Sequence, residues 1–121
     1  GGVTLDGYHW ELAGDEIVLR LRWRTESPLD AGYTVFVHLV EAGGGGAPLS
    51  QADAPPMGGR WPTYLWLPGV AVDDIHRVPL PAGLAPGVYD LLVGLYDPET
   101  STRLPLDAGG DAVRIGDVPI R

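Results

Sequence analysis

The sequence predicts an all-β fold, an antiparallel β-sandwich of the immunoglobulin or fibronectin type III kind with seven to eight strands. The 121 residues include 18 Gly and 12 Pro, a composition that favours short strands and tight turns over helices. Several segments alternate apolar and polar residues and are separated by turn residues at near-regular spacing. The length is typical of one domain, so we expect residues 1–121 to share a single core.

The first two strands are expected at residues 3–12, with a break at Gly7, and at residues 16–24. The second shows the clearest alternation in the chain, which is typical of a sheet with one face in water. Its apolar face carries Ile17, Leu19, Leu21 and Trp23, and its other face carries Val18, Arg20, Arg22 and Arg24. The three arginines form a basic stripe that could bind an anion such as a lipid phosphate. Pairing with acids on a neighbouring strand is the simpler expectation.

The next strand, at residues 33–41, is apolar on both faces. Phe36, His38 and Val40 share the face that would otherwise meet water, so we expect this face to be partly covered. A histidine that is hydrogen-bonded inside a partly buried surface explains His38 most simply. The alternative is that Phe36, His38 and Val40 form an interface with another domain.

The remaining strands follow from turn residues. Gly43–Gly46 suit a flexible hairpin tip, and residues 48–54 then form a short return strand. Residues 73–80 form a further strand, in which Pro79 indicates a sheet edge. Residues 88–97 alternate strongly, and Tyr89 after a Pro-Gly corner resembles the tyrosine corner of immunoglobulin-like sandwiches. A turn at Asp97 and strands at residues 102–106 and 112–120 complete the pattern.

Residues 55–72 follow neither strand nor helix periodicity and are rich in proline and aromatic residues. A long aperiodic segment in a small domain is usually functional or is held by its own side chains. Trp61, Tyr64 and Trp66 could therefore stack on sugar faces as exposed rings, or fold back and close one end of the core. Both interpretations can hold for different rings. Asp53 precedes the segment and is the expected polar partner of the rings.

Charge and composition exclude several function classes. The net charge of −8 argues against nucleic-acid binding, which needs concentrated Lys or Arg. The chain has no Cys, so disulfides and thiolate metal sites are excluded. The three histidines match no metal motif, and the acid clusters fit turn capping better than calcium binding. No catalytic motif occurs, so we expect no catalytic residues, no metal and no cofactor.

An ordered set of segments resembles a known family. These segments are YTVFVHL at 33–39, QADAPP at 51–56, WPTYLWLPG at 61–69, PGVYDL at 86–91 and GLYDP at 94–98. Together they resemble the C-terminal β-sandwich domains of bacterial multi-spanning membrane glycosyltransferases of the dolichyl-phosphate-mannose mannosyltransferase-like kind. The four-glycine tip departs from the polar turn expected at that place in the family.

The resemblance implies an extracytoplasmic accessory domain, excised from a larger membrane protein and tethered through a region outside residues 1–121. It implies a non-catalytic role, either docking on the transmembrane domain of the parent protein or holding a carbohydrate acceptor. Trp61, Tyr64, Trp66 and Asp53 are then the expected ligand-binding residues. The alternative is a structural or adhesion domain of a bacterial surface protein with no sugar role. An enzyme that uses paired acids is a third, weaker hypothesis.

Overall fold

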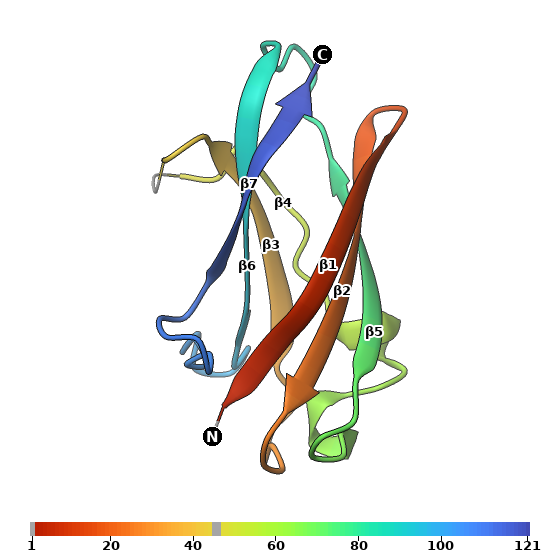
Figure 1. The fold of residues 1–121 in the computed structure, drawn as a ribbon, viewed down its shortest axis with the longest axis vertical. Helices are drawn as coiled ribbons and strands as arrows, with labels where there is room; N and C mark the ends of the chain where they lie inside the picture. The colour runs from red at the N-terminus through yellow and green to blue at the C-terminus, as the bar shows by residue number, and fades with distance from the viewer. Residues whose placement is uncertain (1, 45–46) are drawn as a thin grey trace.

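The computed structural model describes residues 2–44 and 47–121, and in that part of the chain seven strands form two antiparallel sheets (Figure 1). The predicted β-sandwich is therefore confirmed. The strands are β1 (Val3–Ala13), β2 (Glu16–Thr25), β3 (Thr34–Glu41), β4 (Ser50–Gln51), β5 (Val72–Pro79), β6 (Gly87–Tyr96) and β7 (Val113–Ile120). Sheet A has the order β1-β2-β5, and sheet B has the order β4-β3-β6-β7.

The core lies between the two sheets and is built from the alternating apolar positions. In β2 the predicted inner residues Ile17, Leu19, Leu21 and Trp23 are all buried. They face the buried side chains of β3, β6 and β7, chiefly Val35, Val37, Leu39, Leu91, Val93, Leu95 and Ile115. Because side chains alternate across a strand, one apolar set on each strand is enough to fill the space between the layers.

Some strand boundaries differ from the prediction. The strand β1 does not break at Gly7 but continues through it, with a bulge between Leu5 and Gly7 that absorbs one residue. Residues 48–54 do run beside β3, since the amides of Ala52 and Ala54 donate to it, but only Ser50–Gln51 pair as a strand. Residues 102–106 make isolated bridges instead of a strand.

Two predicted turns are confirmed by their hydrogen bonds. The Tyr89 hydroxyl donates to the carbonyl of Ala85 at 2.6 Å, which is the tyrosine-corner contact. The Asp97 carboxylate accepts from the amide of Glu99 at 2.9 Å and so holds the turn after β6. Of the predicted flexible tip, Gly45 and Gly46 lie outside the described residues.

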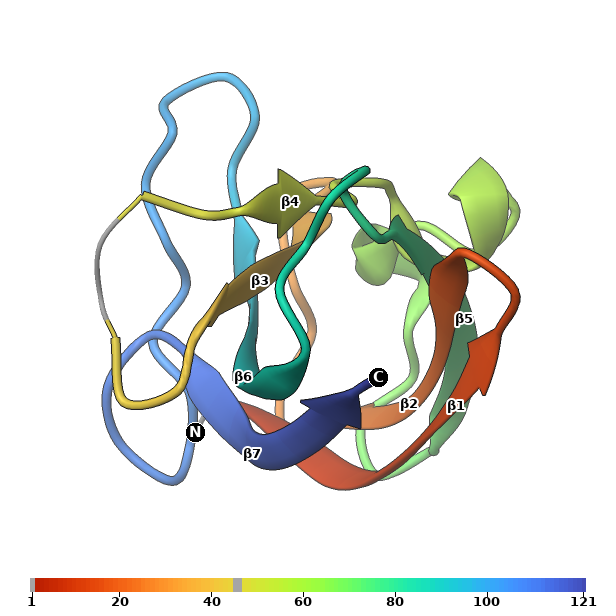
Figure 2. The same cartoon turned by 90° about the horizontal axis from the view of Figure 1, so that it is seen from above.

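The aperiodic segment lies beside the free edge of β5. It contains two short 3-10 turns, η1 (Pro56–Gly59) and η2 (Thr63–Leu65). In Figures 1 and 2 this segment is drawn in light green; η1 lies outside β5, and η2 lies at the end of the sandwich near the turn after β2. The strand β5 pairs only with β2 among the described strands, which confirms the edge position indicated by Pro79. No described helix has the length and apolarity needed to cross a membrane.

Candidate functional site: an aromatic loop and an arginine-lined groove

The aperiodic segment at residues 55–72, called the aromatic loop from here on, is fixed to the body of the sandwich by hydrogen bonds. The buried Thr63 hydroxyl donates to the carbonyl of Ala31 at 2.6 Å and accepts from the amide of Tyr33 at 2.9 Å. Farther along, the amide of Gly69 donates to the carbonyl of Thr25 at 2.9 Å. These contacts tie the loop to the turn between β2 and β3, so its side chains are presented in a defined arrangement.

The three aromatic residues of this loop divide into one core residue and two exposed ones. Trp66 is only 2% exposed and belongs to the hydrophobic core. Its indole N–H donates to the carbonyl of Trp61 at 3.0 Å. Trp61 is 43% exposed and Tyr64 is 57% exposed. The expectation that Trp66 binds a ligand is therefore wrong, because its ring is enclosed, whereas Trp61 and Tyr64 remain accessible.

Apolar exposure in this loop extends beyond the two rings. Leu65, Leu67 and Val70 are also exposed, each by about half or more. Five large apolar side chains thus reach solvent within ten residues of sequence. A cluster of this kind on a rigid loop is typical of a surface that contacts another molecule.

The expected docking face on β3 is covered by the chain itself. Phe36 is 1% exposed and Val40 is 2% exposed, although neither belongs to the central core. The Arg103 guanidinium lies 4.3 Å from the centre of the Phe36 ring, and the His38 ring lies 5.0 Å from it. Phe36 and Val40 are therefore not available to another domain, which corrects that part of the prediction. His38 is partly buried, as the simpler interpretation expects, but its nearest acid oxygen, on Asp53, lies at 3.7 Å, beyond hydrogen-bond distance.

Asp53 lies beside this covered face. Its carboxylate is 3.7 Å from Nε2 of His38. Burial and this carboxylate both raise the pKa of Tyr96, whereas burial lowers the pKa of His38 despite the nearby acid. Asp53, His38 and Tyr96 line a shallow hollow of about 210 Å³. These neighbours of Asp53 are not residues of the aromatic loop, and its expected role as the polar partner of the rings stays a prediction.

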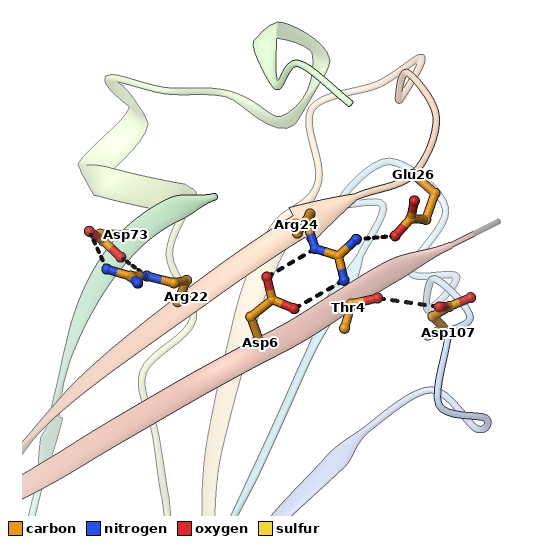
Figure 3. A network of polar contacts seen from close by, with 7 residues as sticks. All are labelled: Thr4, Asp6, Arg22, Arg24, Glu26, Asp73 and Asp107. Atoms are coloured by element: carbon orange, nitrogen blue, oxygen red, sulfur yellow. Dashed lines mark hydrogen bonds and ion pairs between the residues drawn. The ribbon is translucent and has the colours of Figure 1, made fainter. Parts of the chain in front are cut away.

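Two arginines of the predicted basic stripe pair with acids, as expected (Figure 3). Arg22 donates to Asp73 on β5 at 2.7 and 3.3 Å, and Arg24 donates to Asp6 on β1 at 3.0 and 3.2 Å. Arg24 also contacts Glu26. The bonds to the carboxylates raise the pKa of both guanidinium groups, and the bond from Arg22 lowers the pKa of Asp73. Both pairs are at the surface and contribute little stability.

A groove of about 830 Å³ lies over this outer face of sheet A. Its floor comes from β1, β2 and β5, and η1 with the residue after it supplies a wall. The lining includes Gly7, His9, Arg20, Arg22, Arg60, Met57, Asp73 and Ile75. The sequence pattern placed the arginines on one face, but it gave no sign that residues 57–60 return to that face.

The sequence analysis also missed a buried polar pair on β5. Asp74 belongs to one of the acid clusters, beside the exposed Asp73, but it is 1% exposed and points to the inside of the sandwich. Its carboxylate lies 2.5 Å from Nε2 of the buried His76 and accepts from the amide of Met57 at 2.8 Å. The alternation of β5 contained the signal, since Val72, Asp74, His76 and Val78 share one face.

Comparisons with known proteins leave the family resemblance as an inference from sequence. No protein-family model matches the chain, and the search of curated proteins gives no match. Among the described residues, no group of three or more His, Asp or Glu side chains is placed to hold a metal ion. The candidate site therefore consists of the exposed rings of the aromatic loop and the adjoining groove.

Proposed function

We propose that this chain is a non-catalytic, extracytoplasmic accessory domain of a membrane glycosyltransferase, and that it holds a carbohydrate acceptor on Trp61 and Tyr64. The observation that carries the proposal is the pair of exposed rings on a loop fixed by Thr63 and Trp66. Flat, half-exposed aromatic rings bind the apolar faces of sugars at little cost in conformational entropy. The segments that resemble the glycosyltransferase family include this same loop.

The proposal is tested by titrating the protein with a panel of neutral and acidic oligosaccharides, with binding followed by NMR. We expect Trp61→Ala to weaken binding about tenfold, since loss of one stacked ring corresponds to about 1.4 kcal/mol. Leu67→Ala is the matched control, because Leu67 is an exposed apolar residue of the same loop that offers no ring. Absence of binding by every oligosaccharide, or equal loss in both variants, would overturn the sugar-holding role.

A second candidate is docking on the transmembrane domain of the parent protein. The exposure of Leu65, Leu67 and Val70 favours it, because aliphatic side chains suit a protein surface better than a sugar. This role predicts that Leu67→Ser releases the domain from its parent in a co-purification assay. It also predicts that neither the unsubstituted protein nor Trp61→Ala binds sugar measurably. The structural or adhesion alternative predicts that neither substitution has a binding effect.

A further inference from the structure

The floor of the groove on sheet A is built from two rows of residues across three strands. In one row Arg20 lies between His9 and Ile75, and in the next Arg22 lies between Gly7 and Asp73. Gly7 leaves open space, because a Cβ atom there would meet nothing within 4 Å. The groove is therefore hollow where the sheet carries no side chain, and it is bordered by the half-exposed Ile75.

The groove lining holds three arginines and three aspartates, and two of these arginines form no ion pair in the described residues. Five of the eight arginines form ion pairs with acids in the described residues. Arg20 and Arg60 form none there, and both line the groove. The acids of the lining have other partners: Asp6 pairs with Arg24, Asp73 pairs with Arg22, and Asp74 contacts His76. Two guanidinium groups thus face the groove without a carboxylate, although the protein carries a net charge of −8.

The wall of the groove is held in an unfavourable backbone conformation. Met57 has φ 52° and ψ 36°, a left-handed conformation that residues with a side chain rarely adopt. Its amide donates to the buried Asp74, which in turn contacts His76. A buried pair therefore fixes the turn that carries Met57 and Arg60 over the sheet. Backbone strain that is maintained in this way occurs most often at binding sites.

From these observations we infer that the groove binds acidic saccharides through their carboxylates. Arg20 on the sheet and Arg60 on the wall fit two separate carboxylates along a sugar chain, since guanidinium groups pair well with planar carboxylates. Ile75 and Met57 provide apolar contact for pyranose faces, and Asp6 and Asp73 provide acceptors for hydroxyl groups. The inference rests on the proposed function and specifies its substrate class, because Arg60 directly precedes Trp61 in the aromatic loop.

The test compares three probes on the 121-residue protein at low salt. They are an oligogalacturonate, the same oligosaccharide with its carboxylates reduced to alcohols, and inorganic phosphate. We expect the oligogalacturonate to bind at least about tenfold more tightly than its reduced form, and this preference to weaken as salt screens the charges. Arg20→Gln and Arg60→Gln should each abolish most of the preference. Gly7→Phe should block the groove, because a Cβ atom at this position meets nothing within 4 Å and the ring can extend into the open space, and circular dichroism checks that the fold is kept.

Arg77→Gln is the matched control, because Arg77 lies on the same outer face of sheet A, pairs with Glu16, and is outside the groove lining. Arg77→Gln removes one positive charge, as Arg20→Gln does, and we expect it to change the affinity for the oligogalacturonate by less than about twofold. Equal loss in Arg77→Gln and Arg20→Gln would overturn the inference, as would phosphate binding that depends on Arg20 and equals that of the acidic sugar.

The outcomes separate the inference from the proposed function. If the acidic and reduced oligosaccharides bind equally and Trp61→Ala weakens both, the groove assignment fails and the sugar-holding role stands. If neither of these two oligosaccharides binds, the groove assignment fails, and the sugar-holding role fails only if the other oligosaccharides of the panel do not bind either. A carboxylate preference that Arg20→Gln removes, while Trp61→Ala lowers the affinity for both oligosaccharides, supports both.

Discussion

The two tryptophans of the aromatic loop should respond to truncation in opposite ways. Trp66 is buried in the core, whereas Trp61 keeps nearly half of its surface in water. Replacing a buried tryptophan by alanine removes a large apolar group and leaves a cavity, which costs about 3–5 kcal/mol. The indole hydrogen bond to Trp61 adds about 1 kcal/mol within that range. We therefore expect Trp66→Ala to lower the free energy of unfolding by about 4 kcal/mol.

Truncation of Trp61 should cost much less. Because its ring is 43% exposed, truncation leaves no enclosed cavity, and we expect the typical loss for a point substitution, about 1 kcal/mol. Its contact with Trp66 uses the backbone carbonyl, which the Trp61→Ala variant retains. Trp66→Phe keeps a ring in the core and loses the N–H donor, so it should lie between the two alanine variants. These three variants separate the packing of Trp66 from its hydrogen bond.

The assay is equilibrium unfolding in urea, followed by circular dichroism so that the loss of a tryptophan does not affect the signal. With a slope of about 2 kcal/mol per molar urea, a loss of 4 kcal/mol moves the midpoint by about 2 M. The free energy of unfolding of a domain of this size is about 5–15 kcal/mol in total, so a loss of 4 kcal/mol is readily measured. Equal midpoints for Trp66→Ala and Trp61→Ala would refute the assignment of Trp66 to the core.

Two further predictions concern sheet B. At Gly94 a Cβ atom would lie 2.5 Å from the Phe36 ring and 2.6 Å from the carbonyl oxygen of Asp111. Gly94→Ala should therefore lower the free energy of unfolding in urea by at least about 2 kcal/mol. An unchanged free energy of unfolding would contradict this packing. The pKa of His38 lies below 6.5 because of burial, so as the pH falls through 6.5 the unfolded chain gains a proton that the folded chain does not. Stability should therefore decrease from pH 7.5 to 5, and His38→Gln should flatten that decrease; identical pH profiles would disprove it.

The candidate site was only partly predictable from the sequence. The aperiodic, aromatic character of residues 55–72 correctly marked the segment that carries Trp61 and Tyr64. The choice of which ring is buried was not predictable, because the loop has no periodicity that assigns a side chain to a face. It was decided by hydrogen bonds from Thr63 and Gly69 to a turn that is distant in sequence.

The apolar face of β3 shows the same limit. The sequence correctly indicated that Phe36 and His38 need cover. One apolar face of the strand packs on the core, and the other face is too apolar to be left in water. It suggested another domain, whereas Arg103 of the same chain lies over Phe36. Cover supplied by a distant loop has no signal in the local alternation of β3.

The sequence by itself determined the sandwich, because the alternation of β2 and β6 and the turn residues between strands are local properties of the chain. The tertiary structure alone decided where the groove lies. It brings Arg60 to the same groove as Arg20, aligns Gly7 with Arg22, and places Asp74 within hydrogen-bond distance of the amide of Met57. These neighbours come from segments far apart in sequence, and their pairing depends on strand order and on the return of a loop, which local patterns do not encode.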